Sequence, residues 1–166
     1  MSRGTDQLKE MEQLVASTRR RTDVLFKTGM EAAHAADVNR MERSTSSLRE
    51  AIKNPKLPRD FVLGIQGQLR DIELLGYRKY IDATLNLARR AAQTHDDKKK
   101  FALLKTVRDY LPKAVAAGAG EDFRRDTMRV MEIVEFTGTP VVPPEGTKAK
   151  PNEKNPAPMP ANRAKF

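Results

Sequence analysis

The apolar residues of this chain recur at helical spacing, and they are densest over residues 61–92. At about 100° per residue, one side of residues 61–75 is apolar, and beyond Gly76 a different side takes over. The apolar stripe rotates by roughly 110° at this glycine if the helix is ideal. Glycine costs about 1 kcal/mol relative to alanine inside a helix, which permits a break without requiring one. We therefore predict one helix over residues 59–94 that packs against two different partners, and a break at Gly76 is the alternative.

A second long apolar side runs through residues 5–36, where Thr5 or Asp6 can cap the start of a helix. It also fits a heptad repeat, which is typical of helices that pair along a seam. Residues 61–75 can cover only part of a helix this long, so we expect some of the seam to remain exposed. We predict that it pairs with another copy of this chain or with a helix of a different protein. The seam consists of Leu8, Met11, Leu14, Val15, Leu25, Phe26, Ala32 and Ala36.

Asp37 ends this stripe, and another apolar side follows over residues 38–52. Ser47 and Glu50 match a capping box, so a helix start near Ser47 is the alternative. Two prolines within residues 54–58 then give the firmest break in the chain.

Two shorter helices are predicted after the central one. The first, over residues 97–117, folds back on the second half of the central helix because the connection is short. Pro112 lies inside it and is predicted to kink or end it, since proline lacks a backbone donor. The last helix, over residues 121–136, is expected to compete for residues 61–75.

The composition changes at Thr137, because the final 30 residues hold seven of the ten prolines. Such a composition predicts a disordered or extended tail. The predicted fold is all-α: an extended helical bundle or hairpin of about five helices. It divides into a coiled-coil-like segment (1–53), a bundle core (54–136) and a basic, proline-rich tail (137–166).

The overall composition narrows the class of protein. The 166 residues are 39% hydrophobic, 32% charged and 5% aromatic, so the core must be thin and aliphatic. The absence of cysteine removes disulfides and thiolate chemistry. No run reaches the roughly 18 apolar residues of a spanning helix, and the first residues lack the apolar region of a signal peptide. We therefore expect a cytoplasmic protein.

Candidate catalytic and metal-binding residues are few. His95 with Asp96 and Asp97 offers metal-ligand types, but a helix-capping turn explains them more simply. Glu31 and His34 match half of a di-iron motif, and the apolar stripes lack the other carboxylates that such a site needs. Phosphate-binding loops and nucleophile motifs are absent from the sequence. We therefore expect no enzyme, no cofactor and no metal.

The net charge of +9 favours acidic partners. Neighbouring residues on a helix point about 100° apart, so each basic cluster spreads its charge round the helix, and 22 acids are interleaved with 31 bases. The predicted function is a non-catalytic helical adaptor or structural subunit that binds proteins, and a nucleic-acid-binding accessory protein is the alternative. The predicted basic surface consists of Arg19, Arg20, Arg21, Arg89, Arg90, Lys98, Lys99, Lys100, Arg124 and Arg125.

Overall fold

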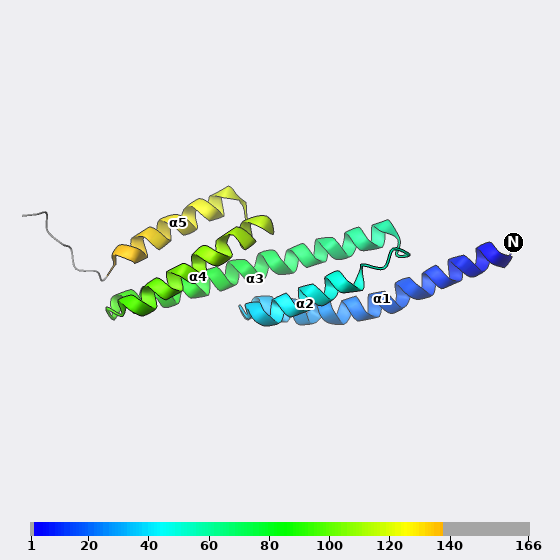
Figure 1. The fold of residues 1–166 in the computed structure, drawn as a ribbon, viewed down its shortest axis with the longest axis horizontal. Helices are drawn as coiled ribbons and strands as arrows, with labels where there is room; N and C mark the ends of the chain where they lie inside the picture. Colours follow the sequence, from blue (N-terminus) through cyan, green and yellow to red (C-terminus); the bar gives the residue numbers. More distant parts are fainter. Residues whose placement is uncertain (1, 138–166) are drawn as a thin grey trace, which may run out of the picture.

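The computed structural model describes residues 2–137, and all five secondary-structure elements in that range are α-helices (Figure 1). The all-α prediction is confirmed. The prediction of a disordered tail concerns residues that lie outside the described range. The helices are α1 (Ser2–His34), α2 (Val38–Ala51), α3 (Arg59–Gln93), α4 (Asp97–Ala116) and α5 (Gly120–Phe136).

Helix α3 is the central element of an elongated molecule (Figure 1). It continues through Gly76 without a break. The first half of α3 packs against the antiparallel pair α1 and α2, and its second half packs against α4 and α5. The rotation of the apolar stripe therefore has the predicted cause, which is a change of packing partner along one continuous helix.

The connections between α1 and α2 and between α3 and α4 have the same local conformation. Ala36 and His95 adopt left-handed backbone conformations, with φ of 57° and 59°. The aspartate that follows each of them caps the next helix: the backbone N–H of Arg40 donates to Asp37 at 3.2 Å, and that of Lys99 donates to Asp96 at 3.1 Å. Helix α2 therefore begins at Val38, and the alternative start near Ser47 is wrong.

The hydrophobic core runs without interruption along both halves of α3. Met41, Leu48 and Ile72 are fully buried in the first half, and Leu104 and Val134 in the second. Two glycines let the helices approach closely in the first half. A Cβ atom on Gly29 would lie 3.0 Å from Ile72 Cδ1, and one on Gly76 would clash with Met41 Sδ.

Helix α4 runs through Pro112 to Ala116, close to the predicted bounds, so of the two predicted effects of the proline only an end to the helix is wrong. The expected position of α5 is corrected. Helix α5 does not pack on residues 61–75, because the three-residue turn before it holds it antiparallel to α4 and beside the second half of α3 (Figure 1). The guanidinium carbon of Arg78 accordingly lies 4.9 Å from the ring centroid of Phe123. Among residues 2–137, no helix combines the length and apolarity needed to cross a bilayer.

Candidate interaction surfaces

The first part of α1 extends beyond the connection between α2 and α3 (Figure 1). We call residues 3–17 the α1 arm. Every residue of the arm is exposed except Leu14 and Val15, which are partly buried. Leu8 is 56% exposed and Met11 is 43% exposed, although both belong to the apolar seam. The arm therefore presents an apolar stripe to solvent.

The remainder of the seam is used inside the chain. Ala32 is fully buried, and Leu25 and Phe26 pack against the core. Ala36 lies in the turn between α1 and α2 and is partly exposed. The small residues in the second half of α1 allow α2 and α3 to pack closely against it, as the close approach of both helices at Gly29 shows. Of the eight residues predicted to bind a partner, Leu8 and Met11 are the two that are exposed.

A shallow hollow of about 530 Å³ lies at the base of the arm. Its walls include Met11, Val15 and Arg19 from α1, and Pro58 from the residue before α3. The guanidinium carbon of Arg19 also lies 5.1 Å from the ring centroid of Phe61, which fixes this side chain against α3. Glu12, Arg20 and Asp23 line the hollow as well, so the arm leaves the folded body at a surface where apolar, basic and acidic groups are mixed.

The predicted basic residues have different surroundings. Arg124 pairs with Glu121 at 2.7 Å, and Arg125 pairs with Asp122 at 3.0 Å. Arg89 donates to the side-chain oxygen of Asn86 at 3.3 Å. The remaining exposed members occur in two places, on α1 and around the connection between α3 and α4. They are Arg19, Arg20, Arg21, Arg90, Lys98 and Lys99.

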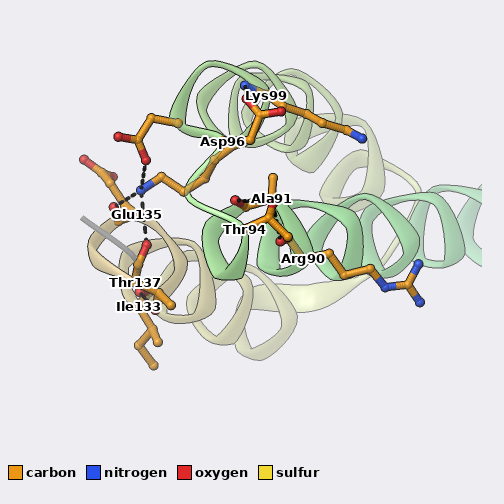
Figure 2. A network of polar contacts seen from close by, with 10 residues as sticks. Arg90, Ala91, Thr94, Asp96, Lys99, Ile133, Glu135 and Thr137 are labelled. Carbon is orange, nitrogen blue, oxygen red and sulfur yellow. Dashed lines mark hydrogen bonds and ion pairs between the residues drawn. The ribbon is translucent and has the colours of Figure 1, made fainter. Parts of the chain in front are cut away.

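Lys100 does not belong to the basic surface, because it is fully buried. Its Nζ atom donates to the backbone carbonyls of Glu135 at 2.7 Å and Thr137 at 3.3 Å, and it lies 3.6 Å from the Asp97 carboxylate. Glu135 and Thr137, at the end of α5, lie beside the start of α4, whereas Lys99 points away from them (Figure 2). Lys100 therefore caps the C-terminus of α5 from a neighbouring helix.

The sequence carried a signal for this role. Lys100 stands four residues before Leu104 and seven before Val107, so it lies on the apolar side of its helix. A lysine in that register is expected to be buried and to find acceptors inside the fold.

A polar cluster joins the two halves of the molecule, and sequence reasoning did not identify it. The hydroxyl of Tyr77 donates to Glu42 Oε2 at 2.6 Å, and Lys113 Nζ donates to the same oxygen at 3.1 Å. Lys113 Nζ also lies 4.7 Å from the ring centroid of Tyr110. Burial, and then the hydrogen bond to Glu42, raise the pKa of Tyr77 well above its usual range. These residues come from α2, α3 and α4, so no local pattern relates them.

A second apolar surface lies between α4 and α5. A groove of about 640 Å³ is lined by Leu111, Pro112, Val115, Met128 and Met131. Met128 is 49% exposed. At one end, Arg108 and Glu135 approach to 3.7 Å across the groove.

Candidate chemistry is sparse in the part of the chain that the structure describes. His95 lies in the turn before α4 and Asp96 caps that helix, while Glu31 forms an ion pair with Arg40 at 3.5 Å. Within residues 2–137, no three histidine, aspartate or glutamate side chains gather where they could share a metal ion. Comparisons with protein-family models, curated proteins and solved structures find no match for this chain.

Proposed function

We propose that this protein is a non-catalytic helical adaptor or structural subunit, and that the α1 arm is its principal docking element. The observation that carries the proposal is the continuation of one apolar seam from inside the fold into solvent. Thr22, which lies two heptads after Leu8 on the same side of α1, is fully buried, whereas Leu8 and Met11 are 56% and 43% exposed. A stripe that continues an internal packing surface is suited to receive another helix.

The energetics of the arm support the same proposal. Isolated helices of about 12–15 residues are marginal in water, because most helical stability in proteins comes from packing of an apolar face. The arm has this length and packs little against its own chain. A partner helix on the exposed stripe would supply the missing packing and exclude water from Leu8 and Met11. The proline-rich tail, with its excess of basic residues, is proposed as a second contact with an acidic partner.

The proposal is tested with the full chain as bait in extracts of its native cell. The test variant is Leu8→Asp with Met11→Asp, which places two charges on the seam. The control is Val24→Asp, because Val24 is 65% exposed on α1 but faces away from the seam. A partner retained by the natural chain and the control, and lost with the test variant, is the expected result. Equal retention by all three proteins would contradict docking through the arm.

A cytoplasmic location belongs to the same proposal, and fractionation of the native cell tests it. Recovery of the protein with membranes after a salt wash would contradict that part of the proposal.

A further inference from the structure

The groove between α4 and α5 ends beside the last residue that the structure describes. Arg108 of α4 and Glu135 of α5, which approach to 3.7 Å, mark one end of it, and Ala116 and Arg124 mark the other. Because the two helices are antiparallel, the first of these ends lies next to the last turn of α5 (Figure 1). The chain that continues beyond Thr137 therefore begins at one end of the groove.

The start of that chain is held against α4. Thr137 follows α5 in an extended backbone conformation, with φ of −73° and ψ of 133°. Lys100 of α4 donates to its carbonyl at 3.3 Å (Figure 2). The next residue is Gly138, and glycine adopts turn conformations that other residues avoid. The chain can therefore reverse direction here and run back along the boundary between α4 and α5.

From this arrangement we infer that residues 140–144 of the same chain occupy the groove. Their sequence is Pro-Val-Val-Pro-Pro, and no charged residue occurs between Thr137 and Glu145. The inference goes beyond the proposed function and does not involve the α1 arm. It leaves the basic residues from Lys148 onward outside the groove, where an acidic partner can reach them.

The chemistry of the groove suits an uncharged, apolar segment. Leu111 and Met131 are buried in its lining, and Pro112 and Met128 are exposed there. Methionine side chains adapt to irregular apolar surfaces, so they can pack against both valine and proline. Prolines also hold a chain extended, which lowers the conformational entropy that docking costs.

The length of the segment matches the length of the groove. From Glu135 to Arg124 the groove follows α5 for roughly 16 Å, at about 1.5 Å per residue. A polyproline chain rises about 3.1 Å per residue, so about five residues span this length. After a turn at Gly138, Val142 is expected at the level of Met128.

The covalent connection favours this occupant over a separate molecule. Only residues 138 and 139 lie between Thr137 and the proposed segment. A short flexible link of this kind gives an effective concentration in the millimolar range. A second copy of the chain would have to reach that concentration in solution to compete for the groove.

The absence of cysteine allows the contact to be tested by disulfide formation. The test variant of the full chain is Met128→Cys with Val142→Cys, and the control is Ile133→Cys with Val142→Cys. Ile133 is 60% exposed, lies on a different side of α5 from Met128, and is closer to Val142 in the sequence. A segment without a fixed position would therefore link to Ile133 at least as fast as to Met128, since shorter loops close more readily.

The rates of disulfide formation are compared in dilute solution by gel mobility without reductant, and circular dichroism checks that the helices remain folded. Faster closure of an internal disulfide through Met128 is the expected result. Equal or slower closure through Met128 than through Ile133 would overturn the inference. Disulfides that join two chains through Met128 would also overturn it, because they would assign the groove to a second copy.

A second measurement leaves the residues of the groove unchanged. The methyl signals of the methionines are recorded by NMR for the natural chain and for Val141→Asp with Val142→Asp, which places two charges in the segment. The Met128 signal is expected to shift between the two proteins, while that of Met41, which is fully buried in the other half of the molecule, stays in place. An unchanged Met128 signal would contradict docking of the segment. Neither result bears on the proposed docking of the α1 arm, so the two proposals stand or fall separately.

Discussion

At the scale of single residues, Gly76 shows how a position that weakens a helix can be required by packing. A Cβ atom here would clash with the sulfur of Met41 and approach Ala33 Cβ to 3.2 Å, and both residues are fully buried. We expect Gly76→Ala to lower the free energy of unfolding by about 1–3 kcal/mol, because the core cannot take the methyl group without moving. Chemical denaturation measures the change.

Gly64 and Gly67 provide matched controls within the same helix. A Cβ atom at either position meets nothing within 4 Å. Alanine should therefore stabilise the protein there by roughly 0.5–1 kcal/mol, which is its advantage over glycine in a helix interior. If Gly76→Ala were also stabilising, the close approach of α2 to α3 would be wrong.

Lys100 contributes to stability as an internal donor. Its Nζ atom holds the carbonyl of Glu135 at 2.7 Å from a fully buried position. Lys100→Met keeps most of the side-chain volume but leaves that carbonyl without this donor, so we expect a loss of about 1.5–3 kcal/mol. Hydrogen exchange should accelerate most in the last turn of α5. Lys99→Met, at an exposed neighbouring position, is expected to change stability by less than about 0.5 kcal/mol.

At the scale of helices, much of the fold could be predicted from periodicity. Five helices follow from patterns that are local in the sequence. The patterns favour a continuous α3 but leave a break at Gly76 as an alternative, and the close packing of Met41 against this glycine is not visible in them. The position of α5 does not, because residues 61–75 and 77–92 both offer apolar surface and only the length of the preceding turn decides between them. The same limit applies to the interaction surfaces. The pattern identifies Leu8 and Met11 as apolar. That they remain exposed depends on where α3 begins, because α1 extends past this point beside Pro58.

The contact between Glu42 of α2 and Tyr77 of α3 predicts that the free energy of unfolding depends on pH in the alkaline range. Burial, followed by the bond to Glu42, raises the pKa of Tyr77 above its usual value of about 10. When the pH rises past about 10, Tyr77 loses its proton in the unfolded chain but keeps it in the folded protein. The free energy of unfolding therefore falls. Below that pH the contribution is constant.

Tyr77→Phe removes the group and should therefore show a shallower decline of stability between about pH 10 and 12. At neutral pH it should cost about 0.5–1.5 kcal/mol through the lost hydrogen bond. Denaturation across the pH series measures both effects. Tyr110→Phe keeps the bond between Tyr77 and Glu42, and it should retain the steep decline. Parallel curves for Tyr77→Phe and the natural protein would contradict the raised pKa.

At the scale of the whole molecule, the net charge of +9 bears on how strongly the protein binds nucleic acid. Its exposed bases are divided between α1 and the connection of α3 with α4, and several others are paired with acids. We expect weak, sequence-independent binding that falls steeply with salt, because it depends on release of counterions from phosphate. Fluorescence anisotropy with single-stranded and duplex oligonucleotides measures it. Tight, sequence-selective binding at about 0.15 M salt would favour the nucleic-acid function over the adaptor.

The shared central helix predicts that the two halves of the molecule unfold together. Helix α3 is continuous through both halves, and Glu42 of α2 bonds to Tyr77 of α3 and Lys113 of α4. A defect in the first half should therefore lower the stability of the second by the same amount.

Leu48→Ala provides the test, because Leu48 is fully buried in α2 and its truncation should cost about 2–5 kcal/mol. Native-state hydrogen exchange reports the result at the amides of Leu104 and Val107 in α4, which lie in the other half. Their opening free energy is expected to fall by the global ΔΔG, and Leu104→Ala should have the reciprocal effect on α2. If the α4 amides kept their full protection in Leu48→Ala, residues 1–53 and 54–136 would behave as separate folding units. The polar cluster at Tyr77 would then be a contact between domains and not part of one cooperative core.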